Sequence, residues 1–597
     1  MDSPTTLVKS HAPGRPIPAA KRSLAAVLRS SRWVFGLLFL ASGVINMLML
    51  TGSIYMMQVY DRVLGSQSVP TLIALSVMAI AAYTLQGLLE YLRARALALI
   101  GAGIDAEIGP QVMTVAAELP LRQSSAVLGD GSVDSGLANF RHLQEIRGFL
   151  AGPGPSALFD LPWMPLYVAA AFLLHAWLGW LIVGGALISV LLALLAEWLS
   201  KTSTRLAIET ISERNGLTEA IVRAAEAVRA MGMLPDLARD WNNMHARAMA
   251  AQSSQTASAG ALGIVARTFR TILQSTVLGL GAYLAIKGQV SAGALIAASI
   301  LASRALAPVD MAIGSWRGFV GARHGYTRLN EVLRLFPSQP QLFALPPPAK
   351  SLDVDNITVT APGSAANPPK IVVRRARFRL DAGQALGVIG ASASGKSSLA
   401  RGIIGLWPLH GGDVRLDNAA ITQWSQVDLG HAIGYLPQDV QLIDGSIGEN
   451  VARFEAGPSS TDIIAATEAA GFHDHVKALG GYDTRIGRGG THLSAGQRQR
   501  LGLARALYKK PFLVVLDEPN ANLDQDGEAA VVRAIAAVKA WKGIAIVIAH
   551  RPQAIEAVDF LLLMHGGDMI TFGPRDEVLK KFVLNAQQIN RSTAKVV

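Results

Sequence analysis

The sequence predicts a membrane-spanning bundle of α-helices followed by a soluble α/β domain. Three observations lead to this prediction. Hydrophobic residues make up 51% of the 597 residues and charged residues only 16%, against about 25% charged in an ordinary soluble protein. Long uncharged stretches fill the N-terminal half. After a proline-rich segment near residue 340, apolar runs of strand length alternate with helical segments.

Composition excludes several classes of protein. The chain has no cysteine, which excludes a disulfide framework, a thiol nucleophile and cysteine-ligated zinc or iron–sulfur sites. A net charge of +11 often indicates nucleic-acid binding, but the arginines here are spread among apolar residues. Basic cytoplasmic loops of a membrane protein explain this charge better, and we expect no nucleic-acid partner.

Uncharged stretches predict six membrane spans. A bilayer core about 30 Å thick needs roughly 20 apolar residues of helix. The third stretch has 36 uncharged residues, enough for two spans that turn near residues 175–179. The last two stretches have only 16 residues each, so Arg270 or Arg304 must lie on an interior or interfacial face. The stretches are residues 33–60, 63–89, 161–196, 271–286 and 288–303.

Arginine and lysine counts predict how the spans are oriented. Residues 1–32, 90–160 and 197–270 carry twenty basic residues, whereas the intervening short loops carry only Arg62 and Lys287. Because basic loops stay on the cytoplasmic side, both termini and the two long loops are expected there. Residues 1–32 lack the apolar core and cleavage site of a signal peptide. We expect a disordered basic arm, with weak attraction to anionic lipid as the alternative.

The same patterns divide the chain into five parts. The long cytoplasmic segments have helical spacing, so the helices are expected to protrude beyond the bilayer. Five prolines in residues 335–350 prevent a helix from continuing and indicate a linker. The expected parts are a basic tail (1–32), a transmembrane domain with long cytoplasmic helices (33–334), the linker (335–350), an α/β domain (351–580) and a C-terminal tail (581–597).

A phosphate-binding loop follows a predicted strand at residues 385–389. The pattern G-x-x-x-x-G-K-S, between a strand and a helix, lets backbone N–H groups close around phosphates at the positive end of the helix. Lys396 is expected to contact the β- and γ-phosphates of ATP, and Ser397 to ligate Mg²⁺. A glycine- and serine-rich turn is the alternative, which the flanking strand disfavours. The expected ATP-binding residues are Gly390, Ala391, Ser392, Ala393, Ser394, Gly395, Lys396, Ser397 and Ser398.

A second apolar strand, residues 512–516, ends in two acidic residues. Asp517 is an expected ATP-site residue. It lies at the end of a buried central strand, where its carboxylate can ligate the Mg²⁺ ion that accompanies ATP. Glu518 can orient and polarise the attacking water. The alternative is a solvated strand terminus, which the lysine of the loop disfavours. Together these residues predict an ATP hydrolase.

Further motifs follow in the order found in the ATPases of ABC transporters, and residues 351–580 resemble that family. The segment 493–497 (LSAGQ) resembles its signature motif, and Gln438 resembles its Q-loop glutamine. The segment 522–524 resembles its D-loop, and His550 its switch histidine. The resemblance implies that Glu518, His550 and Gln438 are catalytic, that Ser397, Gln438 and Asp517 hold Mg²⁺, that Gln438 also contacts ATP, and that Leu493, Ser494, Ala495, Gly496, Gln497 and Asp524 contact ATP held by a second chain.

The resemblance therefore implies a homodimer with two composite ATP sites, each using the loop of one chain and the signature motif of the other. One family feature is missing. An aromatic residue usually precedes the loop and stacks on adenine, but residues 359–369 contain none. The sequence does not identify the adenine contact.

Two segments of the membrane half, residues 55–71 and 159–165, resemble motifs of type I secretion exporters, most closely the protease and lipase exporter branch. Residues 149–154 and 519–524 also resemble that branch. The fold implied is an ABC exporter with six spans and one cytoplasmic ATPase domain per chain.

By this resemblance the chain energises the export of unfolded proteins, which carry a C-terminal signal, across the bacterial inner membrane. The implied partners are a periplasmic adaptor, an outer-membrane channel and the secreted cargo. A lipid or drug exporter of the same fold is the alternative, and an ABC ATPase that regulates without pumping is a second one. Without cysteine, the cargo is not processed by a thiol mechanism.

Polar residues in the membrane half leave several interpretations open. Asp61 and Arg62 pair with each other, meet a periplasmic partner or lie in a solvated turn. Trp163 is interpreted as an interfacial anchor. Arg304 either lines a polar path for the polypeptide or lies in a cytoplasmic extension of the sixth helix, and we slightly favour the extension.

Overall fold

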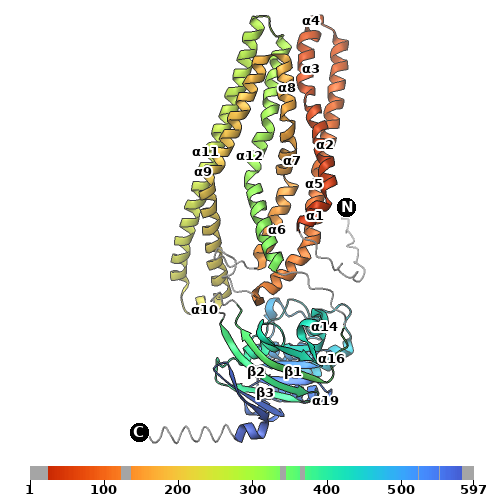
Figure 1. Ribbon diagram of the computed structural model, residues 1–597, viewed down its shortest axis with the longest axis vertical. Coiled ribbons are helices and arrows are strands. Elements are labelled where there is room, and N and C mark those ends of the chain that lie inside the picture. Colours follow the sequence, from red (N-terminus) through yellow and green to blue (C-terminus); the bar gives the residue numbers. More distant parts are fainter. Residues whose placement is uncertain are drawn as a thin grey trace. The chain divides into compact units, whose positions relative to one another are not determined.

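The computed structural model describes residues 24–122, 136–335, 345–362, 370–521, 523–549 and 551–580. The chain divides into two compact units, one formed by residues 1–117 and 134–337 and the other by residues 118–133 and 338–597. Figure 1 shows long helices in the first unit and a sheet with surrounding helices in the second.

The described part of the first unit is built from helices, several of which run side by side along its length (Figure 1). Between residues 151 and 164 the chain forms short helical pieces, whereas α9, α11 and α12 are long and continuous. The helices are α1 (Leu24–Ser30), α2 (Arg32–Met49), α3 (Thr51–Gln58), a π-helix (Val59–Val63), α4 (Leu64–Ser66), α5 (Val69–Arg122), α6 (Gly136–Ala151), α7 (Pro153–Asp160), a 3₁₀ turn (Leu161–Trp163), α8 (Met164–Leu174), α9 (Ala176–Arg223), α10 (Ala225–Ala230), α11 (Leu234–Ile286) and α12 (Ala292–Leu335).

By length and composition, five helical segments in the described part can cross a membrane, and a shorter apolar helix lies where the fourth span was predicted. The predicted tight turn is present, because α8 ends at Leu174 and His175 is extended before α9 begins. His175 accepts a hydrogen bond from the backbone N–H of Trp177 and caps α9. The five segments are Arg32–Ser66, Val69–Leu119, Pro153–Leu174, Gly263–Ile286 and Ala292–Arg334, and the shorter helix is Ala176–Leu192.

The long helices are also longer than a bilayer is thick. Helix α11 has 53 residues and α12 has 44, which correspond to about 80 Å and about 66 Å at 1.5 Å per residue. Both lengths exceed the roughly 30 Å hydrocarbon core. These lengths agree with the predicted protrusion of helices beyond the membrane, which stays a prediction. The sixth span begins at Ala292, later than the predicted residue 288, because residues 287–291 form a turn.

Two features, one in the N-terminal arm and one at Asp61, differ from expectation. The arm is not disordered over Leu24–Ser30, which forms α1 and buries Leu24 and Val27 against Ile104 and Ile108. Asp61 accepts hydrogen bonds from the hydroxyl of Ser291 and, at 2.8 Å, from the backbone N–H of Gly293. Asp61 thus caps α12, a contact that no interpretation of the sequence included.

The two arginines of the last spans are placed differently from each other. Arg270 of α11 forms an ion pair with Asp310 of α12, which supplies the partner that a charge near the membrane needs. Arg304 lies twelve residues after Ala292, or about 18 Å along α12. That distance is shorter than the roughly 30 Å hydrocarbon core, and the placement of Arg304 in a cytoplasmic extension stays a prediction.

The second unit contains a ten-stranded sheet in the order β5-β4-β1-β2-β10-β9-β3-β8-β7-β6. Strands β6, β7, β8, β3 and β9 pair in parallel, and β1, β2, β4 and β5 form an antiparallel part. The predicted strands at 385–389 and 512–516 are confirmed as β3 and β7. The bounds are β1 (Ser351–Thr360), β2 (Ile371–Asp381), β3 (Ala385–Gly390), β4 (Leu409–Leu416), β5 (Ala419–Ala420), β6 (Ile433–Leu436), β7 (Leu513–Asp517), β8 (Ile544–Ile548), β9 (Phe560–His565) and β10 (Asp568–Pro574).

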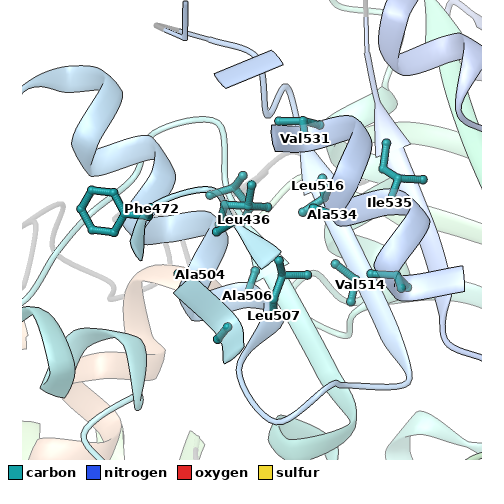
Figure 2. Close-up of a cluster of buried hydrophobic side chains, with 14 of the residues drawn as sticks. Leu436, Phe472, Ala504, Ala506, Leu507, Val514, Leu516, Val531, Ala534 and Ile535 are labelled. Carbon is teal, nitrogen blue, oxygen red and sulfur yellow. The ribbon is translucent and has the colours of Figure 1, made fainter. Parts of the chain in front are cut away.

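Alternation along the central strands builds a core on each face of this sheet. In β7, Val514 and Leu516 face one cluster, while Leu513 and Val515 face the other. Figure 2 shows the first cluster, where these side chains meet helices α18 (Ala495–Leu507) and α19 (Gln525–Ala540). All five residues of β7 are buried. Burial on both faces explains why this strand reads as a continuous apolar run.

Candidate nucleotide site

The phosphate-binding loop connects β3 to α13 (Lys396–Ile403), and its backbone requires both glycines. Gly390 and Gly395 have φ angles of 154° and 98°. A Cβ atom on Gly390 would lie 2.3 Å from the carbonyl oxygen of Met564, and one on Gly395 would lie 2.8 Å from that of Val372. Both the conformation and the close approach of neighbouring strands therefore exclude larger residues. Residues 391–393 of the loop are exposed.

Lys396 folds back over this loop. Its Nζ donates hydrogen bonds to the carbonyl oxygens of Gly390 and Ala391, at 3.0 and 2.8 Å. Burial lowers the pKa of Lys396, while the nearby carboxylates of Glu518 and Asp517 act in the opposite direction. The ammonium is thus enclosed beside the loop and close to both acids.

Asp517, at the end of β7, is fully buried. Its Oδ1 accepts a 2.9 Å hydrogen bond from the hydroxyl of Ser397, the residue that follows the loop lysine. Its Oδ2 is buried with no hydrogen-bond partner within the described part of the chain. Burial raises the pKa of Asp517, opposed by the Ser397 hydrogen bond and by Arg401. A hydroxyl beside a buried carboxylate oxygen is a fitting pair of ligands for a hard divalent cation such as Mg²⁺.

Glu518 lies next to this pair and contacts the expected Q-loop residue. Gln438 donates a 2.8 Å hydrogen bond from Nε2 to Glu518 Oε2. Glu518 has a φ of 50°, which is unusual for a non-glycine residue. Its backbone N–H donates to the carbonyl of Ile548 in β8, so the sheet holds the strained turn. The structure therefore brings together Lys396, Ser397, Gln438, Asp517 and Glu518.

The signature motif forms the start of α18. Ser494 Oγ accepts from the N–H of Gln497, and Gln497 Oε1 accepts from the N–H of Ser494, which is a capping box. Ser494 and Ala495 are exposed and Gly496 is half-buried. The side chain of Leu493 is buried in the hydrophobic core and anchors the motif. Among the described residues, no hydrogen bond joins this motif to the loop.

Sequence reasoning missed two side chains that tie α18 to the D-loop. Arg500 forms a 2.6 Å ion pair with Asp524 and donates to the carbonyl of Gly471 at 3.1 Å. The adjacent Gln499 donates to the carbonyl of Pro519 at 3.3 Å. The pKa of Asp524 is lowered chiefly by the hydrogen bond from the backbone N–H of Gly527. The hydrogen bond from Arg500 lowers it further. The only sequence signal was polar residues on the buried face of an otherwise apolar helix. Asn522 and His550 lie outside the described residues.

Asp517→Asn tests this site in two ways, by the melting temperature without nucleotide and by the rate of ATP hydrolysis. Because burial raises the pKa of Asp517, its ionisation costs folding free energy at pH values above the folded pKa, and that stability is regained as the pH falls. An isosteric amide carries no charge, so the variant without nucleotide should melt at pH 7 no lower than the parent. Its Mg²⁺-dependent ATP hydrolysis should fall by at least about a hundredfold.

Thermal unfolding and ATP hydrolysis of the purified full chain measure both effects. Asp483→Asn, which removes an exposed carboxylate of the same domain, is the matched control and should change neither quantity. A large drop in melting temperature without nucleotide, or retained hydrolysis, would contradict the assignment.

Comparison with known proteins adds to this geometry. Residues 373–521 match the family model of ABC transporters, and residues 33–308 match that of the ABC transporter transmembrane region. The chain is 45% identical over 575 residues to the type I secretion system ATP-binding protein PrsD of Rhizobium meliloti, covering 96% of each. It is 27% identical to the cyclolysin secretion/processing ATP-binding protein CyaB of Bordetella pertussis, covering 92% of this chain and 76% of that one.

A solved structure of a bacterial Atm1-family ABC exporter with ATP bound has the same fold. It superposes with a TM-score of 0.76 at 22% identity, and the match covers 95% of this chain and 99% of the other. The predicted fold class, a membrane helical bundle with an ABC ATPase domain, is confirmed.

Proposed function

We propose residue roles for a chain that belongs to the ABC transporter family, among the ATP-binding proteins of type I secretion. The chain hydrolyses ATP and couples the reaction to protein export as the energising component in the inner membrane. Beyond that, we propose that the cargo is an unfolded polypeptide with a C-terminal signal. One observation carries the residue roles: Lys396, Ser397, Gln438, Asp517 and Glu518 lie within one hydrogen-bonded site.

In this proposal Lys396 and the N–H groups of the loop contact the phosphates of ATP. Ser397 and Asp517 hold Mg²⁺, with Gln438 completing the set, and the bound ion would neutralise charge on the β- and γ-phosphates. Glu518 accepts a proton from the attacking water, and the hydrogen bond from Gln438 fixes the orientation of its carboxylate. His550 is proposed to contact the γ-phosphate.

The exposed signature motif supports a homodimer. Ser494 is available at the N-terminus of a helix, where the dipole favours an anion. Since no hydrogen bond in the described part joins Ser494 to its own loop, we propose that it contacts ATP held by a second copy. Asp524 forms an ion pair with Arg500, which lies in the helix that Ser494 caps. Asp524 would therefore reach the same ATP site as Ser494.

The proposed partners are a periplasmic adaptor and an outer-membrane channel, which a type I secretion system implies. A lipid or drug exporter shares the fold, but the 45% identity to a type I secretion protein over nearly the whole chain favours protein cargo. Neighbouring genes for an adaptor would support the same choice.

A mixed dimer with two affinity tags tests the composite sites and the export function together. If one chain carries Ser494→Arg and the other Lys396→Ala, both lesions fall on one site and the second site stays intact. If one chain carries both substitutions beside a wild-type partner, each site is damaged once. We expect ATP hydrolysis and cargo export to persist only in the first arrangement.

Both arrangements contain the same two substitutions, so any loss of helix capping at Ser494 is matched between them. Reconstituted vesicles allow ATP hydrolysis and cargo uptake to be measured on one preparation. Equal activity in the two arrangements would contradict the shared sites, and hydrolysis without any protein export would contradict the proposed cargo.

A further inference from the structure

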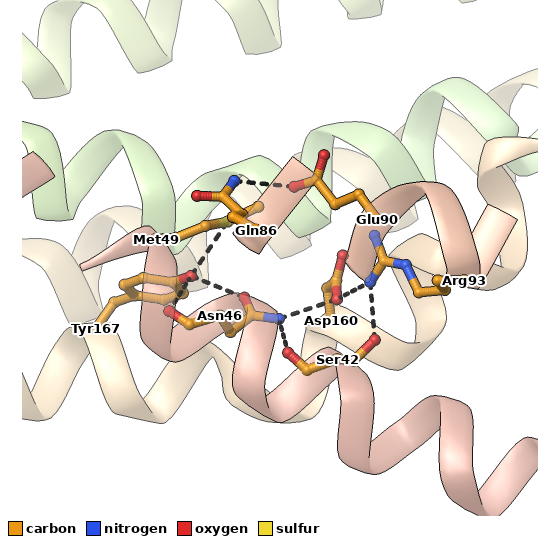
Figure 3. Close-up of polar contacts among 8 residues, drawn as sticks. All are labelled: Ser42, Asn46, Met49, Gln86, Glu90, Arg93, Asp160 and Tyr167. Atoms are coloured by element: carbon orange, nitrogen blue, oxygen red, sulfur yellow. Dashed lines mark hydrogen bonds and ion pairs between the residues drawn. The ribbon is translucent and has the colours of Figure 1, made fainter. Parts of the chain in front are cut away.

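The segment 159–165 resembles an exporter motif, yet nothing in the nucleotide site uses it. Its acidic residue, Asp160, is only 2% exposed. Figure 3 shows its surroundings. Asp160 Oδ1 accepts a 2.7 Å hydrogen bond from Nη1 of Arg93, with which it forms an ion pair, and a 2.9 Å hydrogen bond from Nδ2 of Asn46. The partners lie 67 and 114 residues away in the sequence.

The surrounding hydrogen bonds extend this pair into a network of five buried residues (Figure 3). Arg93 also donates to the hydroxyl of Ser42 at 2.8 Å, and Asn46 donates to the Ser42 carbonyl at 2.8 Å. Tyr167 donates to Asn46 Oδ1 at 2.8 Å. The network therefore connects α2, α5, the end of α7 and α8 at one point.

Helix lengths place this network far from the turn that joins the first two predicted spans. Ser42 lies 24 residues before Ser66, and Arg93 lies 24 residues after Val69. Each is therefore about 36 Å along its helix from the turn that joins the two. This distance exceeds the roughly 30 Å thickness of a hydrocarbon core, so along these two helices the network lies toward the cytoplasmic side.

The helix is interrupted where the chain passes through this network. Helix α7 has eight residues, a 3₁₀ turn of three residues follows, and prolines begin α7, this turn and α8. Such short pieces have few internal hydrogen bonds to fix their direction. Apolar contacts help, since the rings of Phe39 and Trp163 lie 5.4 Å apart and a Cβ atom on Gly43 would approach Trp163 to 2.6 Å.

Stability alone does not account for a buried ion pair here. Replacing such a pair with apolar residues of similar volume is often neutral or stabilising, because burial removes both charges from water. The pair instead fixes orientation. The hydrogen bonds from Arg93 and Asn46 to Asp160 hold the α7–α8 break in one position relative to α5 and α2. Movement of one helix then requires movement of the others.

We infer that Arg93 and Asp160 are positioning residues for transport: they hold α2, α5 and the α7–α8 break together as one rigid body that couples ATP hydrolysis to export. The inference rests on the proposed export function and adds a role for residues outside the nucleotide site. It requires that the network stays closed throughout the transport cycle.

The paired variant Arg93→Met/Asp160→Leu tests this inference. Asn46 keeps Ser42 and Tyr167 as partners in this variant, so no buried amide is left unsatisfied and the protein should fold. We expect near-normal amounts in the membrane and retained ATP hydrolysis, but about tenfold less cargo exported per ATP hydrolysed, within the usual range for coupling between sites. Arg93→Lys, which keeps the charge, should recover part of the coupling.

A matched pair serves as the control. Arg147→Met/Asp105→Leu removes an ion pair between α6 and α5 that is about half exposed, and its export per ATP should equal that of the wild type. Wild-type coupling in the Arg93/Asp160 variant, or an equal loss in the control variant, would overturn the inference. Absence of protein export by the wild type would instead count against the proposed function.

Crosslinking distinguishes a rigid body from a joint that opens. Because the chain has no cysteine, Phe39→Cys/Trp163→Cys can be joined by a short bifunctional thiol reagent without background labelling. Export should continue after crosslinking if the network stays closed. Loss of export only after crosslinking would show that this joint must open, and the inference would be wrong.

Discussion

Glu518→Gln is expected to bind ATP normally and to hydrolyse it about a thousandfold more slowly, the usual contribution of a general base. The amide has nearly the same size as the carboxylate, so the site keeps its shape. The amide, however, cannot accept the proton of the attacking water. The loop, Lys396 and the Ser397–Asp517 pair keep their own hydrogen bonds in this variant and should still hold the nucleotide.

Measurements of bound ATP and of phosphate release on the same preparation separate these effects. Lys396→Ala is the informative comparison, because it removes the ammonium from the loop and should weaken nucleotide binding itself. The rate of phosphate release by Gln438→Ala should lie between the rates of wild type and Glu518→Gln, since this variant removes one hydrogen bond to the Glu518 carboxylate but keeps the carboxylate. Near-normal phosphate release by Glu518→Gln would contradict the role of this residue.

Local sequence signals predicted the ATPase domain well because its chemistry follows the order of the chain. The phosphate loop is contiguous, and its glycines are required by backbone geometry at Gly390 and Gly395. Asp517 and Glu518 directly follow an apolar strand that is buried on both faces. Parallel pairing of β3, β7 and β8 then brings these strand ends to one edge.

Contacts between distant residues could not be predicted in the same way. Nothing in the spacing of the sequence indicates that Arg93 meets Asp160, or that Asp61 caps a helix more than 200 residues away. These pairs arise from helix packing, which depends on which faces of the spans meet. Leu493 was placed at the ligand by its motif, yet its apolar side chain is buried in the core.

The export function leads to the second large effect, which concerns the folding of the cargo. A folded domain of 100 residues has a radius of gyration of about 13 Å. The twelve spans of the proposed homodimer could not part far enough to admit it while remaining packed. A C-terminal signal also delays export until synthesis ends, which gives the cargo time to fold. Cargo that needs millimolar calcium to fold would stay unfolded in the cytoplasm and fold only after export.

Fusing a fast-folding, calcium-independent domain to the N-terminus of a cognate cargo should therefore block export almost completely. A variant of that domain destabilised by about 4 kcal/mol should restore it, since its unfolded fraction rises about a thousandfold. Secretion of both fusions into the medium, with cellular amounts as the reference, measures the effect. The same fusions without the cargo's C-terminal segment are the control and should stay inside. Because a pump for small lipids or drugs has no use for that segment, equal export with and without it would contradict protein cargo, and equal export of the folded and destabilised fusions would contradict transport of an unfolded chain.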